Sequence, residues 1–374
     1  MDEGRRGSDP GSRIVAVRSS TGRFRMEGTS VGNAADKGAA EEDPIDVVIT
    51  WVDGADPDHA ARRATHADRH HRSTATAASR FSDNAELLFS LASIARFAPW
   101  AARVLIVTDG QTPPYLETVL KAYGTACPAI EVVSHHEVFR GHEDVLPTFS
   151  SRTIETMLHR IDGLSERFVY LNDDFMLARP MRPSDFFDGS KPIIRGARRP
   201  IVQPLALSGK RLARRLVGRP ERPGFNAAQM EGARLARDLA ENDPSPRPTS
   251  DFIAVGHWPH PMRRSTLQRF FDRHPERLRA QIAHRFRDSR QFSPIGLANA
   301  LERAKDAPVR PPPSTAYFTP SKPKTREFKT MLDGLLAGSF DNACVQSVDL
   351  MDEVRRNALM RALETRYGVK TARR

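Results

Sequence analysis

The stretch Phe168-Val169-Tyr170-Leu171-Asn172-Asp173-Asp174 joins an apolar run of strand length to two adjacent carboxylates. Such a run is expected to be a buried strand whose carboxyl end carries polar residues into the region where open α/β sheets bind ligands. Neighbouring carboxylates repel each other unless a positive charge lies between them, and a divalent cation bound to a substrate phosphate supplies that charge. Asp173 and Asp174 are therefore candidate metal ligands. The alternative is that they only cap a helix or form a turn.

Two further apolar runs of strand length also end in aspartate. Residues 45–52 are followed by Asp53 and Gly54, and residues 104–108 are followed by Asp109. Three such runs predict one parallel sheet with an acidic rim along its carboxyl edge.

Helical patterns separate these runs. Residues 84–98 place apolar side chains on one face before Pro99 ends the helix, and residues 151–161 repeat the pattern. Strands that alternate with amphipathic helices indicate βαβ units with right-handed crossovers. The predicted fold class is α/β with a mostly parallel sheet.

Composition sets the outer limits. The 374 residues can bury one large core, or a core domain with a smaller lobe. No apolar run approaches the ~20 residues of a membrane-spanning helix, and the charged run at 13–18 is too short for a signal peptide. The two cysteines, Cys127 and Cys344, lack the pattern of a disulfide framework or a metal site. A cytoplasmic location is expected.

The chain divides into three predicted parts. Residues 1–43 are rich in Gly, Ser, Arg and Glu without periodicity and are expected to be a disordered tail. Residues 44–310 form the predicted catalytic domain, interrupted at 188–250 by a basic insertion rich in Pro and Arg that holds one helix at 226–241. Residues 311–374 are expected to pack on the core and to end in a basic tail.

The net charge is +11, and the insertion contributes much of it. Residues 191–222 hold ten basic residues and one acid, but no aromatic residue to stack on bases. With no nucleic-acid-binding motif in the chain, sequence-specific nucleic-acid binding is not expected. The basic stretch is expected to attract an anionic substrate, an anionic polymer or a membrane surface.

A second group of candidate residues lies at 80–87, which reads Arg80-Phe81-Ser82-Asp83-Asn84-Ala85-Glu86-Leu87. Asp83 or Asn84 can cap the following helix, and Glu86 lies in its first turn, where the helix dipole favours an acid. The functional alternative is that Asp83 and Glu86 face the same rim as Asp173, where one of them accepts a proton or positions a metal.

A third group contains two histidines and an arginine. His257 and His260 flank a Trp-Pro step, which is expected to hold both imidazoles in a fixed, extended loop. A neutral imidazole is a natural base for a hydroxyl nucleophile, and the alternative is a pair of surface histidines. Zinc is not expected, because no Cys or third His stands at suitable spacing. Arg287 can grip a phosphate through two hydrogen bonds, although a solvated helix face is the commoner role.

Four segments together resemble the successive conserved regions of the Stealth family of sugar-1-phosphate transferases. They are residues 45–54, 80–115, 146–187 and 251–292, and together they are far more specific than any single motif. The matching text includes Thr50-Trp51-Val52-Asp53-Gly54, Asp83-Asn84 with Glu86-Leu87, Val107-Thr108-Asp109-Gly110-Gln111, Leu146-Pro147-Thr148-Phe149-Ser150-Ser151 and Tyr170-Leu171-Asn172-Asp173-Asp174.

The resemblance implies a Rossmann-like, glycosyltransferase-A-like core and a nucleotide-sugar donor, usually a UDP-hexose. It implies essential catalytic roles for Asp83, His257 and Arg287. The predicted substrate-binding residues are Trp51, Asp53, Gly54, Arg80, Asn84, Glu86, Asp109, Asn172 and His260. The last region departs from the family pattern, because Cys344 is followed by Val345-Gln346-Ser347 where the family commonly has Asn-Asp after the cysteine.

The predicted activity is transfer of a sugar-1-phosphate from a UDP-sugar to a hydroxyl of a polysaccharide acceptor, with release of UMP, in capsule or exopolysaccharide synthesis. Mg²⁺ or Mn²⁺ held by Asp173 and Asp174, together with Arg287, is expected to stabilise the charge on the phosphoryl oxygens. Either His257 or Asp83 is expected to take the hydroxyl proton. Two alternatives remain: a metal-dependent glycosyltransferase that releases UDP, and a non-enzymatic basic scaffold that binds an acidic polysaccharide. Peripheral association with the inner face of the membrane is a further expectation.

Overall fold

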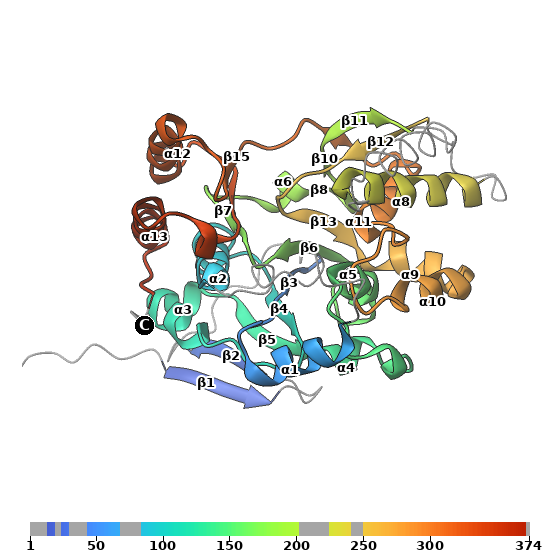
Figure 1. Ribbon diagram of the computed structural model, residues 1–374, viewed down its shortest axis with the longest axis horizontal. Helices are drawn as coiled ribbons and strands as arrows, with labels where there is room; N and C mark the ends of the chain where they lie inside the picture. Colours follow the sequence, from blue (N-terminus) through green and yellow to red (C-terminus); the bar gives the residue numbers. More distant parts are fainter. Residues whose placement is uncertain are drawn as a thin grey trace, which may run out of the picture.

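A seven-stranded sheet forms the centre of the protein in a computed structural model that describes residues 13–18, 24–29, 43–67, 84–201, 224–240 and 250–371 (Figure 1). The strands lie in the order β1-β2-β5-β4-β3-β6-β13. Their bounds are β1 (Arg13–Arg18), β2 (Phe24–Thr29), β3 (Ile45–Thr50), β4 (Arg103–Thr108), β5 (Ala129–Ser134), β6 (Arg167–Asn172) and β13 (His260–Arg263).

The middle of this sheet is parallel. β5, β4, β3 and β6 pair in parallel, whereas β13 runs antiparallel to β6 at one edge and β2 runs antiparallel to β5 at the other. The predicted α/β class with a mostly parallel sheet is confirmed. Because β4 and β5 follow β3 on one side and β6 lies on its other side, the strand order reverses between β3 and β6. Open α/β sheets bind ligands beyond the carboxyl ends of strands at such a point.

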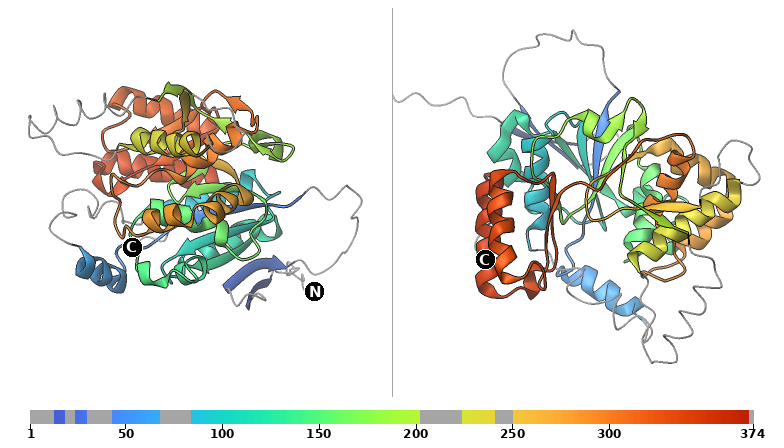
Figure 2. Two further views of the ribbon diagram at one scale, coloured as in Figure 1. Left: turned by 90° about the vertical axis from the view of Figure 1, so that its right-hand side faces the viewer. Right: turned by 90° about the horizontal axis from the view of Figure 1, so that it is seen from above.

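Helices cover both faces of the sheet, as the views in Figures 1 and 2 show. One face carries α2 (Glu86–Phe97), α3 (Leu116–Tyr123), α12 (Thr325–Ala337) and α13 (Glu353–Tyr367). The other carries α5 (Ser151–Met157), α8 (Phe225–Ala240), α9 (Arg264–Arg273), α10 (Pro275–Ile282) and α11 (Pro294–Arg303). Each face has its own apolar core, since successive residues of a strand point to opposite faces. Further α-helices are α1 (Pro57–His66), α4 (His135–Val138) and α6 (Pro183–Phe186).

A small sheet brings the C-terminal part of the chain to the end of β6. It consists of β15 (Thr315–Phe318), β16 (Asn342–Val345) and β7 (Phe175–Leu177), in that order. β7 begins directly after Asp174, and β16 runs antiparallel to it with Cys344 opposite Phe175. Gln346, one residue beyond β16, is therefore carried to the carboxylates that end β6. Three two-stranded pairs complete the fold: β8 (Phe187–Asp188) with β9 (Lys191–Pro192), β10 (Ile194–Arg195) with β14 (Val309–Arg310), and β11 (Ala197–Pro200) with β12 (Asp251–Ala254).

A buried ion pair ties the amino ends of the parallel strands together. Asp46 on β3 is fully buried, and both of its oxygens accept hydrogen bonds from the guanidinium of Arg103 on β4, at 3.2 and 2.7 Å. The backbone N–H of Ser165, just before β6, donates to the same carboxylate at 2.9 Å. A buried carboxylate needs such partners because an unpaired charge is costly to remove from water. The polar contacts therefore fix how three strands begin.

The predicted disorder of residues 1–43 is wrong for two segments. β1 and β2 form an antiparallel pair that extends the sheet beyond β5, and the Met26 side chain is buried in the core. The average composition of this region hides two short runs of strand length, and pairing with β5 satisfies their backbone groups. In the insertion, the predicted helix is present as α8, and the stretches 202–223 and 241–249 lie outside the described residues.

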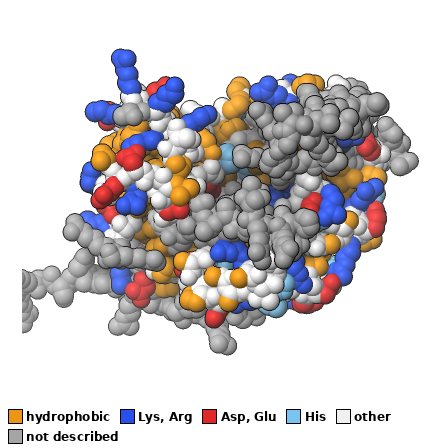
Figure 3. All heavy atoms as spheres, viewed as in Figure 1, with side chains coloured by type: hydrophobic (Ala, Val, Ile, Leu, Met, Phe, Trp, Pro, Cys, Tyr) orange, Lys and Arg blue, Asp and Glu red, His pale blue; other side chains and the backbone are white. Residues whose placement is uncertain are grey.

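The surface carries mixed charges, and the helices are polar. On the face shown in Figure 3, the Lys and Arg side chains are scattered among acidic and apolar ones. Across the described part of the chain, the helices are too short or too polar to cross a lipid bilayer.

The crossing of α8 and α11 gives a test of this packing. An added methyl group at Gly232 on α8 would lie 2.7 Å from the backbone of Ser293 and Leu297. We expect Gly232→Ala to lower the free energy of unfolding by about 1–3 kcal/mol, because the two backbones must move apart. At Gly224 the nearest atom would lie 3.8 Å away, so Gly224→Ala is the matched control. Urea unfolding of both variants measures the difference, and equal stabilities would contradict this close approach.

Candidate functional site

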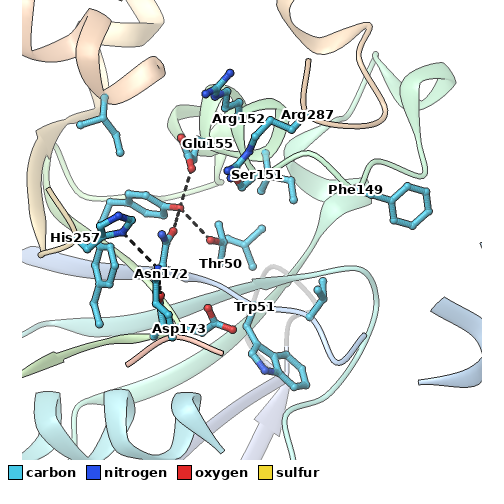
Figure 4. Close-up of a pocket in the computed structure, with 18 of the residues that line it drawn as sticks. Thr50, Trp51, Phe149, Ser151, Arg152, Glu155, Asn172, Asp173, His257 and Arg287 are labelled. Atoms are coloured by element: carbon cyan, nitrogen blue, oxygen red, sulfur yellow. Dashed lines mark hydrogen bonds between the residues drawn. The ribbon is translucent and has the colours of Figure 1, made fainter. Parts of the chain in front are cut away.

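A cavity of about 450 Å³ lies at the carboxyl ends of β3 and β6, where the strand order reverses. Its walls come from α1, α5, α8, the segment after β12, the loop before α11 and the residues after β16. Segments that are far apart in the sequence therefore meet in one site, and the close-up in Figure 4 shows several of their side chains pointing toward its interior.

Tyr170 forms the polar floor of the cavity. Its side chain is 1% exposed, and its hydroxyl donates to Asn172 Oδ1 at 2.7 Å and lies 3.0 Å from Thr50 Oγ1 (Figure 4). Glu155 Oε1 lies 3.4 Å from the same hydroxyl. Burial raises the pKa of Tyr170 well above its ordinary value and raises that of Glu155 as well. The floor is thus a hydrogen-bonded link between β3, β6 and α5.

Asp173 and Asp174 line the cavity beside this floor. Asp174 Oδ2 accepts hydrogen bonds from Gln346 Nε2 at 2.7 Å and from the Cys344 thiol at 3.6 Å. Asp174 Oδ1 is buried and has no hydrogen-bond partner among the described residues. Burial raises the pKa of Asp174 to about 6.

This donor set fits a magnesium or manganese ion. Mg²⁺ is commonly held by one or two carboxylates, and waters and substrate phosphates complete its shell. Asp174 offers a buried oxygen that has no partner in the described part of the chain, and Asp173 offers a second carboxylate next to it in the sequence. Within the described residues, no cluster of three or more His, Cys, Asp and Glu side chains could hold a metal by itself.

Two aromatic rings, here called the aromatic clamp, stack on His257. Phe225 of α8 stacks on it with ring centroids 5.2 Å apart, and Tyr317 of β15 stacks on it at 5.4 Å. Its Nδ1 lies 3.5 Å from Gln346 Nε2. Burial lowers the pKa of His257, and the positive charge of Arg287 lowers it further. The imidazole is therefore neutral at neutral pH.

Two arginines form the positive wall of the cavity opposite the carboxylates. The Arg287 guanidinium donates to Ser151 Oγ, and its buried Nε has no hydrogen-bond partner among the described residues. Arg152 is buried and donates to the backbone oxygens of Asp288 at 3.1 Å and Gln291 at 3.2 Å. Burial, together with the charge of Arg287, lowers the pKa of Arg152 to about 10, so Arg152 remains cationic at neutral pH. The wall suits an anionic group such as a phosphate.

The predicted acidic rim is only partly present. Asp53 and Asp109 do not line the cavity, and each carboxylate has a structural partner nearby. Asp53 Oδ1 accepts from the N–H of Ala55, while Asp109 pairs with Arg62 at 2.8 Å and lies 3.7 Å from His135. The reason is local geometry, because the turns after β3 and β4 direct these side chains to neighbouring loops and not toward β6.

The remaining predicted residues fall into three groups. Trp51, Glu86, Asn172 and His260 line the cavity with the catalytic candidates His257 and Arg287, whereas Gly54 and Asn84 do not. Asn84 instead donates to the Glu86 carboxylate through its backbone and side-chain nitrogens. Arg80 and Asp83 lie outside the described residues.

The expectation that His260 lies in a loop is wrong. It begins β13, opposite Tyr170, and is 5% exposed. Burial lowers its pKa to about 3, so it is neutral at neutral pH. Alternation along the strand turns it inward while its neighbour Pro261 is less buried.

Sequence analysis missed several cavity residues. Thr50 and Tyr170 lie in strands that were assigned to the core, although a polar group in a buried strand next to Asn172 was a usable signal. Phe225 and Gln346 come from the insertion and from the segment that departs from the family pattern. Their sequence context carries no signal that places them at the site.

Two conserved regions of one family match this chain. Residues 43–65 match Stealth protein conserved region 1, and residues 80–193 match Stealth protein conserved region 2. These ranges contain β3, β4, β5 and β6, whose carboxyl ends surround the cavity. The chain therefore carries conserved regions 1 and 2 of the Stealth family.

Named relatives agree with this assignment. An exopolysaccharide phosphotransferase of Streptomyces coelicolor is 39% identical over 238 residues, which cover 62% of this chain and 22% of the relative. A capsular polysaccharide phosphotransferase of Actinobacillus pleuropneumoniae is 35% identical over 157 residues, which cover 41% of each chain. The chain thus spans less than half the length of these relatives. Among solved structures, mouse xyloside xylosyltransferase 1 aligns over 80% of this chain and 97% of its own, with a TM-score of 0.37 and 9% identity.

The charge environment of His257 gives a prediction. Burial and Arg287 both lower its pKa, so we expect its titration midpoint below 6.5 and expect Arg287→Gln to raise it. Arg290→Gln is the control, because Arg290 lies in the same loop but is exposed and paired with Asp288. Histidine NMR titrations of the three proteins measure the midpoints. A midpoint that does not respond to Arg287→Gln would contradict the electrostatic link.

Proposed function

We propose that this protein transfers a sugar-1-phosphate from a UDP-sugar to a hydroxyl of a polysaccharide acceptor and releases UMP, in capsule or exopolysaccharide synthesis. The main support is that conserved regions of a family with members named polysaccharide phosphotransferases surround a single cavity. Paired carboxylates lie on one side of this cavity, and two arginines lie on the other. Opposed charges of this kind suit a reaction at a phosphate between them.

The reaction is a displacement at phosphorus. The acceptor oxygen bonds to the phosphorus that carries the sugar, the bond from that phosphorus to the oxygen of UMP breaks, and the hydroxyl proton passes to a base. Such transfers depend on positioning and on stabilising the charge of the phosphoryl oxygens. Arg287 is the best placed side chain for this role, since its guanidinium lines the cavity and its Nε lacks a partner among the described residues.

Asp173 and Asp174 are the proposed ligands of Mg²⁺ or Mn²⁺. When bound, such a cation neutralises charge on the phosphates of the donor. The Cys344 thiol and Gln346 amide donate to Asp174 Oδ2, which leaves Oδ1 for coordination. The buried position of Asp174 Oδ1 strengthens its interaction with a cation.

The donor and acceptor are proposed to enter from different sides. Trp51 and Phe149 line the cavity near α1 and offer apolar contact for the nucleotide. Phe225 and Ala228 of α8, within the basic insertion, line another part. Long-range attraction by the net charge of +11 would favour an anionic acceptor or an anionic membrane surface near the protein.

The nucleotide product tests the proposed reaction directly. Incubation with UDP-sugars, a polysaccharide acceptor and Mg²⁺ or Mn²⁺ is expected to release UMP, measured by ion-exchange chromatography. Release of UDP would instead support a glycosyltransferase that attacks the anomeric carbon. Binding of an acidic polysaccharide without turnover of any donor would support a non-enzymatic scaffold.

The metal ligands give a further prediction. We expect Asp173→Asn and Asp174→Asn each to lower turnover on the order of a hundredfold or more, because a phosphate-bridging cation loses a charged ligand. Mn²⁺ binding, followed by electron paramagnetic resonance, should weaken in both variants. Asp188→Asn is the control, since Asp188 is exposed on β8. Full activity of both variants, or of the wild type in EDTA, would remove the metal from the mechanism.

A further inference from the structure

Gln346 connects three side chains of the site. Its Nε2 donates to Asp174 Oδ2 at 2.7 Å and lies 3.5 Å from His257 Nδ1. Its Oε1 accepts from the Tyr317 hydroxyl at 2.5 Å. A single amide therefore spans a proposed metal ligand, the imidazole and the ring that stacks on this imidazole.

The orientation of this amide follows from its two contacts. The NH₂ group of Gln346 faces Asp174 Oδ2, and the amide oxygen faces the Tyr317 hydroxyl. The reversed amide would place its oxygen against the carboxylate oxygen. The thiol of Cys344 donates to the same oxygen at 3.6 Å. Asp174 Oδ2 is thus surrounded by donors, and the Gln346 oxygen is left for Tyr317.

The same orientation limits what His257 can do. The NH₂ group has two hydrogens, of which one is directed to Asp174 and the other is available to His257 Nδ1. An amide nitrogen accepts no hydrogen bond, so Nδ1 can only be an acceptor toward it. In a neutral imidazole one nitrogen carries the proton and the other accepts. The proton of a neutral His257 then lies on Nε2.

We infer that Gln346 holds His257 in the tautomer that carries its proton on Nε2, so that His257 donates a hydrogen bond to the substrate and does not accept the proton of the hydroxyl. This inference rests on the proposed function for the identity of the substrate, but the tautomer itself does not depend on it. Gln346 is a positioning residue, because it acts through His257.

The aromatic clamp supports this arrangement. The planes of the Phe225 and Tyr317 rings lie at 15° and 9° to the plane of the imidazole. Phe175 approaches it edge-on, with centroids 6.0 Å apart and planes at 86°. Rotation of the imidazole out of its plane would therefore displace two stacked rings. The ring plane is fixed, and Gln346 selects which nitrogen carries the proton.

The consequence concerns the proton of the acceptor hydroxyl. A hydrogen-bond donor at Nε2 can stabilise the charge of a phosphoryl oxygen, as fixed hydrogen-bond donors do in other enzymes. The hydroxyl proton must then pass to another group. Of the two bases that the sequence suggests, Asp83 is the one that remains.

Nitrogen-15 NMR of the unliganded protein tests the tautomer at one mildly alkaline pH. Two-bond ¹H–¹⁵N spectra distinguish protonation at Nε2 from protonation at Nδ1, and the signals of His257 are assigned by their loss in His257→Asn. We expect the wild type to show protonation at Nε2. Protonation at Nδ1 in the wild type would overturn the inference, whichever nucleotide the enzyme releases.

Gln346→Glu is the discriminating variant, because it replaces the donor with an acceptor of nearly the same shape. We expect Gln346→Glu to move the proton of His257 to Nδ1. Gln268→Glu on α9 is the control, because the Gln268 side-chain oxygen accepts a hydrogen bond from Arg264, and this variant should leave the His257 signals unchanged. An unchanged His257 pattern in a folded Gln346→Glu protein would also overturn the inference. If that variant does not fold, Gln346→Met replaces it. The ratio of His257 protonated at Nε2 to His257 protonated at Nδ1 should then fall by about two- to tenfold, which corresponds to the net free energy of one hydrogen bond.

Discussion

The parallel pairing of β3 with β6 is the contact on which the site depends. Val48 lies opposite Tyr170 and Thr50 lies opposite Asn172, so the polar ends of both strands emerge side by side. A shift of one residue would turn each side chain to the other face of the sheet. The buried Asp46, bound to Arg103 and to the backbone before β6, fixes the start of this register at the far end of the strands. The contacts of Asp46 at the amino ends of the strands thus help to set which side chains reach the site at their carboxyl ends.

The sequence predicted the parts of the fold that have strong local patterns. The β3, β4 and β6 strands are continuous apolar runs, and α2 repeats its apolar face with a helical period. β13, β16 and the β1–β2 pair are short strands with mixed composition, and their partners lie far away in the chain. Their formation depends on pairing and burial, which a local pattern does not contain.

Prediction of the site was also limited to what local sequence patterns contain. Asp173, Asp174 and Asn172 follow directly from the strand that precedes them, and they do line the cavity. Asp53 and Asp109 follow strands of the same kind but are directed elsewhere by their turns and by Arg62. Proximity to a strand end therefore indicates the neighbourhood of a residue, whereas its direction depends on side-chain partners that are distant in sequence.

The small sheet of β15, β16 and β7 determines when, during synthesis of the chain, the site can be completed. Ribosomes add roughly 5–20 residues per second, and N-terminal units fold first. All seven strands of the main sheet precede residue 264, whereas Tyr317 and Gln346 belong to the last part of the chain. The sheet and the carboxylates of β6 can therefore exist as a nascent structure before the imidazole has its clamp. The site is therefore complete only after residue 346 has been added.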